Sequence, residues 1–232
     1  MGGVLLIHHH GTPITPITAL YELAGRHFCV SHAHPADVTR CHQIGQSVML
    51  DNGAFSAWKA NKMTDWQGFY VWCDRWLDCP TTWAVIPDVI DGGSQLQDAL
   101  IREWPHGKRQ AAPVWHMDEP LSRLLCLIED DWSRVCIGST AEYAVVLSDR
   151  WQARMDEMWD AVALTFARTP PLHMLRGMQL SGMRWPFASV DSTDIARNHH
   201  LLHHTPRVMA DRWDGSQTPA RWLVRARQEE LL

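Results

Sequence analysis

Short apolar runs alternate with longer amphipathic segments along this chain, and this alternation limits its fold more than any other feature. Short apolar runs are typical of buried parallel strands, whereas apolar residues at every third or fourth position are typical of helices. The runs predict eight strands, at residues 4–8, 27–31, 47–50, 83–87, 112–116, 134–137, 172–175 and 187–190. Because parallel strands need crossover connections, strands that alternate with helices favour a parallel sheet.

The segments between the predicted strands indicate helices that cover this sheet. They are ITALYELAG, PADVTRCHQIG, DWQGFYVWCDRWL, SQLQDALIREW, EPLSRLLCLIEDD and DRWQARMDEMWDAVALTF. The stretch 176–186 is short and glycine-rich, and no helix is predicted there. Eight strands with interposed helices in 232 residues predict one domain over residues 1–232, a compact (β/α)8 TIM barrel. The alternative is an open doubly wound sheet.

Composition narrows the classes of function. A hydrophobic content of 46% is sufficient for one sizeable core, and the net charge of −5 argues against a broad basic surface for nucleic acid. No apolar run approaches the roughly 18 residues of a membrane span. The N-terminal MGGVLLIHHHG lacks the features of a signal peptide. We therefore expect a cytoplasmic protein with no membrane partner.

Polar side chains follow most of the predicted strands, where a β/α barrel presents its reactive groups. They are His8–His10, His32, His34, Asp51, Asn52, Asp88, Asp91, His116, Ser139, Glu142, Arg176, Asp191 and Asp194. Among them Asp51, Asp88 and Asp191 are expected to converge over the barrel mouth. One carboxylate there can attack a sugar anomeric carbon while a second handles a proton. The competing interpretation is that an Asp after a strand only caps the next helix.

These residues carry a family resemblance. LDNGAFSAWK resembles the Asp-Ser-Gly-Gly-Phe loop of tRNA-guanine transglycosylases, and resembles still more the smaller, often phage-encoded relatives that insert 7-deazaguanines into DNA. The resemblance covers roughly residues 45–200 and continues through AVIPDVIDGG, APVWHMDE, RVCIGSTAEY and LHMLRGMQLSGMRWPFASVDSTDIARN. It implies a glycosyltransferase that exchanges guanine for a free 7-deazaguanine base and needs neither cofactor nor metal.

The resemblance also implies the catalytic roles. Asp191 would be the nucleophile at C1′, and Asp51 would handle the ring-nitrogen proton of the departing or incoming base. The tRNA enzymes carry their nucleophile directly after the Phe of the eighth strand, where this chain has Ala188. Asp191 is therefore assigned by its strand-end position and by the pattern of the smaller relatives. The second Gly of the family's loop is Ala54 here, which leaves less room for the base.

Base binding is implied for a further set of residues. Phe55 would stack on the base, and Asp88 would accept hydrogen bonds from the two adjacent N–H donors of guanine. His116 would contact the base from the fifth-strand loop. Gly138 and Ser139 would offer backbone groups, and Asn52 is expected beside them in the substrate-binding set.

The polymer is expected to be DNA. The chain has no Cys-x-Cys-x-x-Cys cluster, so the zinc-binding subdomain that the tRNA enzymes use beside their tRNA is absent. A barrel-mouth site reaches a guanine only when the nucleotide is flipped out or already single-stranded. Arg176, Arg184 and Arg197 are the candidates for contact with the nucleic-acid backbone, although scattered arginines are more often solvated surface.

Two other classes of function remain open. CVSHAHP ends a predicted strand with His32 and His34, and with His116, His173 and Asp191 it could form the metal site of a hydrolase resembling the amidohydrolase barrels. That family carries its His-x-His on the first strand, whereas a strand precedes it here. A non-catalytic nucleic-acid binding module is disfavoured by the acidic net charge.

Overall fold

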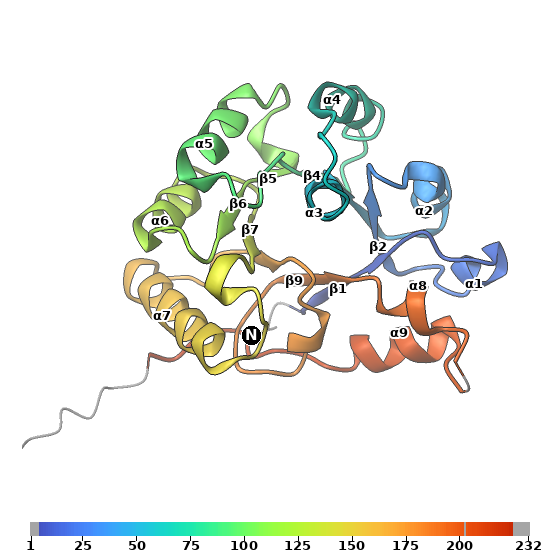
Figure 1. The fold of residues 1–232 in the computed structure, drawn as a ribbon. Coiled ribbons are helices and arrows are strands. Elements are labelled where there is room, and N and C mark those ends of the chain that lie inside the picture. Colours follow the sequence, from blue (N-terminus) through green and yellow to red (C-terminus); the bar gives the residue numbers. More distant parts are fainter. Residues whose placement is uncertain (1–4, 202, 225–232) are drawn as a thin grey trace, which may run out of the picture.

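The computed structural model describes residues 5–201 and 203–224, which form a single parallel sheet surrounded by helices (Figure 1). The strands run in the order β5-β4-β3-β2-β1-β9-β8-β7-β6. Their bounds are β1 Ile7–Gly11, β2 His27–Ser31, β3 Ser47–Asp51, β4 Thr82–Val85, β5 Ala111–Ala112, β6 Val114–His116, β7 Val135–Gly138, β8 Leu172–Met174 and β9 Ser189–Ser192.

The two strands at the ends of this order are halves of one chain segment. Only Pro113 separates β5 from β6, and a proline has no N–H to donate to a strand ladder. β5 pairs with β4 and β6 pairs with β7, so this segment joins the two ends of the sheet into a nearly closed barrel. The predicted (β/α)8 barrel is confirmed, and the ninth strand arises because Pro113 interrupts the fifth predicted one.

The first and last strands lie further along the chain than predicted. β1 begins at Ile7 instead of residue 4, which is outside the described residues, and β9 begins at Ser189 instead of residue 187. The two strands pair in register, with His9 opposite Asp191. The prediction that His8–His10 follow the first strand was therefore wrong. The cause is that buried imidazoles replace aliphatic side chains in β1, so the strand continues beyond its apolar run.

Helices cover the outside of the barrel. They are α1 Ile17–Tyr21, α2 Val38–Ile44, α3 Ala54–Lys59, α4 Trp66–Asp74, α5 Gly93–Glu103, α6 Leu121–Glu129, α7 Asp149–Thr165, α8 Asp194–Asn198 and α9 Pro206–Asp214. Side-chain caps define several starts: Ser148 accepts the Trp151 N–H before α7, and Asp65 accepts the Gly68 N–H before α4. Between residues 176 and 186 the chain forms only the short 3-10 turn Met178–Leu180, as its glycine content predicts.

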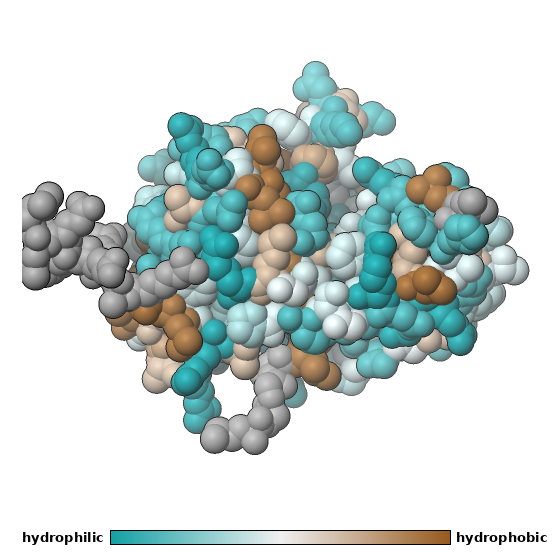
Figure 2. Space-filling view, turned by 90° about the horizontal axis from the view of Figure 1, so that it is seen from below, coloured by the Kyte–Doolittle hydropathy of each residue, from teal (hydrophilic) through white to brown (hydrophobic). Residues whose placement is uncertain are grey.

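Strand alternation divides the apolar side chains between the barrel interior and the layer beneath the helices. The interior cluster contains Cys29, Met49, Trp83, Val85, Ala112, Val114 and Cys136. Two larger clusters fill the space between the sheet and the helices, one around Phe28 and Phe69 and the other around Trp115 and Trp159. The face in Figure 2 is largely hydrophilic, with apolar residues in separate groups. None of the helices in the described residues has the length and apolar character needed to cross a membrane.

His8 of β1 and Arg26 attach α9 to the barrel. His8 lies 3.2 Å from Asp214 through Nδ1 and 2.9 Å from the Ser181 hydroxyl through Nε2. Arg26 forms ion pairs with Asp211 and Asp214. His10, two residues after His8 in β1, is also buried. Neither of its ring nitrogens has a hydrogen-bond partner within the described residues. Burial lowers the pKa of His10 from 6.5 to about 4.

We expect stability to fall as the pH falls from 6.5 to 4. In this window the unfolded chain protonates His10 and the folded protein does not, so acid favours unfolding by up to about 3 kcal/mol. Urea unfolding at pH 7 and at pH 4.5 measures the difference. His10→Leu should reduce this pH dependence, while His200→Leu, at an exposed position, should retain it. An unchanged pH dependence in His10→Leu would show that His10 does not titrate as described.

Candidate active site at the barrel mouth

Three carboxylates lie at the carboxyl ends of the barrel strands. Asp51 is the last residue of β3, Asp88 follows β4, and Asp191 lies within β9. The pKa of Asp51 is raised from 3.8 to about 6, chiefly because burial penalises its charge and further because Asp191 and Asp88 repel it. A hydrogen bond from Ser31 and one from the Gly53 N–H oppose this increase. The Asp51 carboxyl is therefore at its titration midpoint near pH 6 and is mostly ionised at pH 7.

Asp88 is held from both sides. The Asn52 amide donates to its Oδ1 at 2.8 Å and also to the Ile86 carbonyl at 2.8 Å. His116 Nε2 lies 3.0 Å from the other oxygen, Oδ2. Burial opposes protonation of His116, but its hydrogen bond to Asp88 and the charge of that carboxylate outweigh burial, and the net pKa of His116 is raised. The Gln97 amide N–H lies 3.4 Å from His116 Nδ1, which assigns the ring hydrogen to Nε2.

Asp191 is held through one oxygen only. Its Oδ1 accepts the backbone N–H of Arg176 at 2.7 Å and lies 3.2 Å from His173 Nε2. The Ser189 hydroxyl lies 2.8 Å from His173 Nδ1, and burial lowers the pKa of His173. A neutral imidazole that accepts from Ser189 therefore donates to Asp191. Within the described residues Oδ2 has no hydrogen-bond partner, so it is the oxygen available for attack on a substrate.

Phe55 stands beside these carboxylates in the first turn of α3. Gly53 precedes the helix with φ of 80°, a left-handed conformation that glycine adopts without strain, and this turn positions the ring. Phe55 is 37% exposed. The Arg176 guanidinium lies 3.8 Å from the centre of the ring. Arg176, expected on the nucleic-acid backbone, therefore contacts Phe55 with its side chain and Asp191 with its N–H.

Gly138 and Ser139 are placed differently from each other. A Cβ at Gly138 would come within 2.8 Å of the His116 ring, so glycine leaves the space that this histidine occupies. The Ser139 hydroxyl accepts the Trp151 indole N–H at 2.8 Å and donates to the Met117 sulfur. The Ser139 side chain is therefore directed toward α7. Gly138 thus supports His116, whereas the Ser139 side chain belongs to the packing of α7.

The two other arginine candidates make no contact with the three carboxylates in the described residues. Arg184 forms an ion pair with Asp156 of α7 and stacks on Trp185 at 4.2 Å. Arg197 is exposed in the last turn of α8. Neither observation assigns them to a substrate.

The histidines of the metal-site hypothesis do not come together. The His32 ring packs against Phe69 and Trp72 at 5.5 and 5.4 Å. His116 and His173 each pair with a different carboxylate. Over residues 5–201 and 203–224 no group of three or more His, Cys, Asp or Glu side chains is arranged to hold a metal ion.

Comparisons with known proteins do not identify a family. No protein-family model matches the chain, and no curated protein matches it. A solved structure described as native KDPGal is 11% identical with a TM-score of 0.47, over 90% of this chain and 95% of that one. Tryptophan synthase from M. tuberculosis in its aminoacrylate-bound form is 12% identical with a TM-score of 0.48, over 92% of this chain and 94% of that one. Similarity this low carries no argument about activity.

Proposed function

We propose that this protein is a DNA-guanine transglycosylase, which replaces guanine in DNA by a free 7-deazaguanine through a covalent intermediate on Asp191. The observation that carries the proposal is that one barrel mouth holds carboxylates in different environments. Asp51 has its pKa raised to about 6, whereas Asp191 keeps one oxygen outside any protein hydrogen bond in the described residues. Different environments for neighbouring carboxylates are the usual basis for separate acid, base and nucleophile roles.

The first half of the reaction removes guanine. Asp191 Oδ2 forms a bond to C1′ of the deoxyribose while the bond from C1′ to the guanine ring nitrogen breaks. Protonated Asp51 gives its proton to the leaving base, and Asp191 becomes an uncharged glycosyl ester. The Arg176 N–H and the His173 ring hold Oδ1, which leaves Oδ2 for the proposed attack on C1′.

The second half places the new base. A 7-deazaguanine occupies the vacated site and loses its ring N–H proton to ionised Asp51. The nitrogen then attacks C1′ and the Asp191 carboxylate leaves. Two displacements at the same carbon give net retention, as in retaining glycosyl transfer. Asp51 gives up a proton in the first half and recovers one in the second, so it returns to its starting protonation state. The proposed reaction therefore needs no cofactor.

Asp88 is the proposed recognition group for the base. An ionised carboxylate only accepts hydrogen bonds, and guanine offers adjacent N–H donors along one edge. Each oxygen of Asp88 receives one protein donor and has a further lone pair for a ligand. Phe55 would stack on the same base, and the Arg176 guanidinium must leave the ring face that the base takes.

Asp88→Ala is expected to weaken binding of the free base by about 10- to 100-fold, the range of a hydrogen bond to a charged group. Titration of 7-deazaguanine by calorimetry measures this effect. Asp78→Ala removes an exposed carboxylate elsewhere and should bind the base normally. Wild-type affinity in Asp88→Ala would remove Asp88 from the base site.

The proposed function is tested by incubating the protein with isotopically labelled 7-deazaguanine and a guanine-containing DNA, single-stranded or duplex. The DNA is then digested to nucleosides and analysed by mass spectrometry. Labelled 7-deaza-deoxyguanosine with equal release of guanine supports the proposal. Stoichiometric bound zinc in the purified protein, with no label in the DNA, would favour the metal-dependent hydrolase instead.

A further inference from the structure

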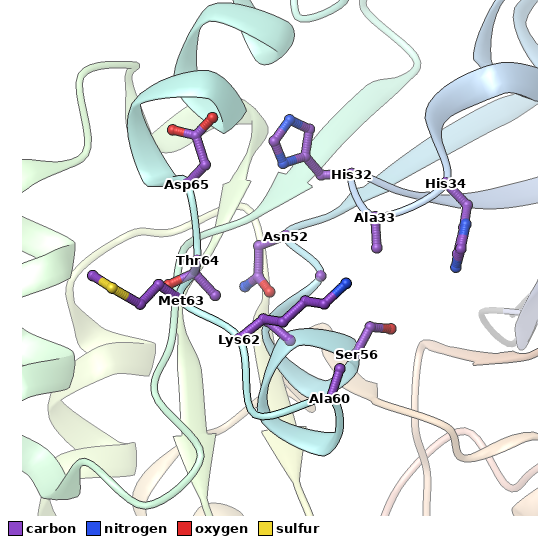
Figure 3. Close-up of a pocket in the computed structure, with 12 residues that line it drawn as sticks. His32, Ala33, His34, Asn52, Ser56, Ala60, Lys62, Met63, Thr64 and Asp65 are labelled. Carbon is purple, nitrogen blue, oxygen red and sulfur yellow. The ribbon is translucent and has the colours of Figure 1, made fainter.

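An open cavity of about 430 Å³ lies beside the barrel mouth, and we call it the α3 cavity. It is formed by the loop after β2, the start and outer side of α3, and the connection from α3 to α4 (Figure 3). The residues that line it are His32, Ala33, His34, Asn52, Gly53, Ser56, Ala57, Ala60, Lys62, Met63, Thr64 and Asp65. Its volume is within the range of small-molecule sites.

The α3 cavity is connected to the candidate active site through Asn52. This residue follows Asp51 directly, and its amide donates to Asp88 Oδ1 at 2.8 Å. Its side-chain oxygen accepts the Ala54 N–H at 2.8 Å, which fixes the amide between the two spaces. Asn52 thus belongs both to the lining of the α3 cavity and to the hydrogen bonds of Asp88.

The charged side chains in the lining of this cavity are one lysine, Lys62, and one carboxylate, Asp65. Within the described residues Lys62 forms no ion pair, and in the view of Figure 3 its amine end extends toward the loop of Ala33 and His34. The one carboxylate in the lining, Asp65, already accepts the Gly68 N–H as the cap of α4. Lys62 can thus receive an anionic group, and the exposed His34 imidazole also lines the cavity.

Apolar side chains also line the cavity. Ala33, Ala57, Ala60 and Met63 supply methyl and thioether surface among the polar groups. A cation next to an apolar wall matches a nucleotide, which combines a phosphate with a sugar and a flat base. In a chain with a net charge of −5, DNA bound here would depend on a single local cation, Lys62, and not on a broad basic surface.

We propose that the α3 cavity binds the nucleotide next to the exchanged guanine, with Lys62 contacting the phosphate between them. This inference rests on the proposed function, since it takes DNA as the polymer. It assigns the backbone contact to a residue of the α3–α4 connection in place of Arg184 and Arg197.

The test compares Lys62→Ala with Lys59→Ala. Lys59 is exposed at the end of α3 and does not line the cavity, so its variant removes an equal charge from the same helix region. Fluorescence anisotropy with a labelled guanine-containing single-stranded oligonucleotide gives the affinity at several salt concentrations. We expect Lys62→Ala to bind about 5- to 10-fold more weakly at low salt, with the salt slope reduced by about 0.7 for one lost phosphate contact. Lys59→Ala should match the wild type.

A second variant tests the cavity without changing charge. Ala60→Trp places an indole in the α3 cavity at an exposed position and should also weaken oligonucleotide binding by several-fold. Free 7-deazaguanine should bind both variants as it binds the wild type, because neither residue contacts Asp88. Circular dichroism and melting curves establish that each variant is folded.

The outcomes separate this inference from the proposed function. Wild-type affinity and salt slope in Lys62→Ala, together with normal binding by Ala60→Trp, would overturn the inference even where base exchange is observed. Lys62-dependent binding of the oligonucleotide supports the inference. If guanine exchange is then absent in the wild type, the proposed function fails while the DNA contact at Lys62 stands.

Discussion

Asp191→Asn is expected to lower the rate of guanine exchange by at least about 10³-fold, because an amide cannot supply the negatively charged oxygen that attacks C1′. Asn has nearly the same size and shape as Asp. The Asn oxygen can still accept the Arg176 N–H and the His173 ring hydrogen, so the strand and the mouth should keep their structure. Binding of the free base should stay within about 2-fold of wild type, since Asp191 is placed opposite the sugar and not the base.

The matched control is Asp194→Asn. Asp194 follows the same strand, but its carboxylate accepts hydrogen bonds from Asn198 and the Trp213 indole, within the α8 and α9 region. Exchange should proceed in this variant at a rate near that of wild type. Full activity of Asp191→Asn would remove Asp191 as the nucleophile and with it the covalent mechanism.

Asp51→Asn is expected to slow both halves of the reaction by about 10²- to 10⁴-fold, the usual contribution of a general acid or base. In the wild type the two halves should have opposite pH profiles. Release of guanine needs protonated Asp51 and should fall as the pH rises above about 6. Attack by the 7-deazaguanine needs ionised Asp51 and should fall below about 6. Single-turnover release and incorporation, measured separately from pH 5 to 8, test this pattern.

The same substitution should stabilise the protein at alkaline pH. Between pH 3.8 and about 6 the folded protein binds the Asp51 proton and the unfolded chain does not, so stability falls as the pH rises through this window. The neutral Asn removes this cost, which is at most about 3 kcal/mol. Melting temperatures at pH 8 and at pH 4.5 measure the gain. If Asp51→Asn and the wild type melted at the same temperature at pH 8 as well as at pH 4.5, and both halves of the reaction had the same pH profile, the raised pKa of Asp51 would be contradicted.

Much of the fold could be predicted from the sequence because its determinants are local. Apolar runs located six of the predicted strands to within about two residues at either end, and the glycines between residues 176 and 186 correctly excluded a long helix. The errors occurred where tertiary burial outweighs composition. Three histidines extend β1 beyond its apolar run, and Pro113 divides one predicted strand into two.

The candidate site was predictable only to a limited extent. The predicted strand ends identify Asp51, Asp88 and Asp191. The strand pattern does not indicate which side chains form hydrogen bonds with which of their carboxylate oxygens. The pairing of Asp191 with His173 joins two strands that contact only in the folded barrel. Ser189 and Asp191 are two residues apart in β9, so their side chains lie on the same side of the strand. This spacing was the available indication that both contact one neighbouring side chain, which is His173. Lys62 lies in a connection, where no periodicity indicates which way a side chain points.

The most direct test of the central claim is whether a covalent adduct joins Asp191 to DNA. Wild-type protein incubated with a guanine-containing single strand and no incoming base, then denatured and analysed by intact mass, should carry the oligonucleotide minus guanine. Peptide mapping should place that mass on Asp191, and Asp191→Asn should carry none. Release of guanine by the wild type with no adduct, or an adduct on a different residue, would contradict the account.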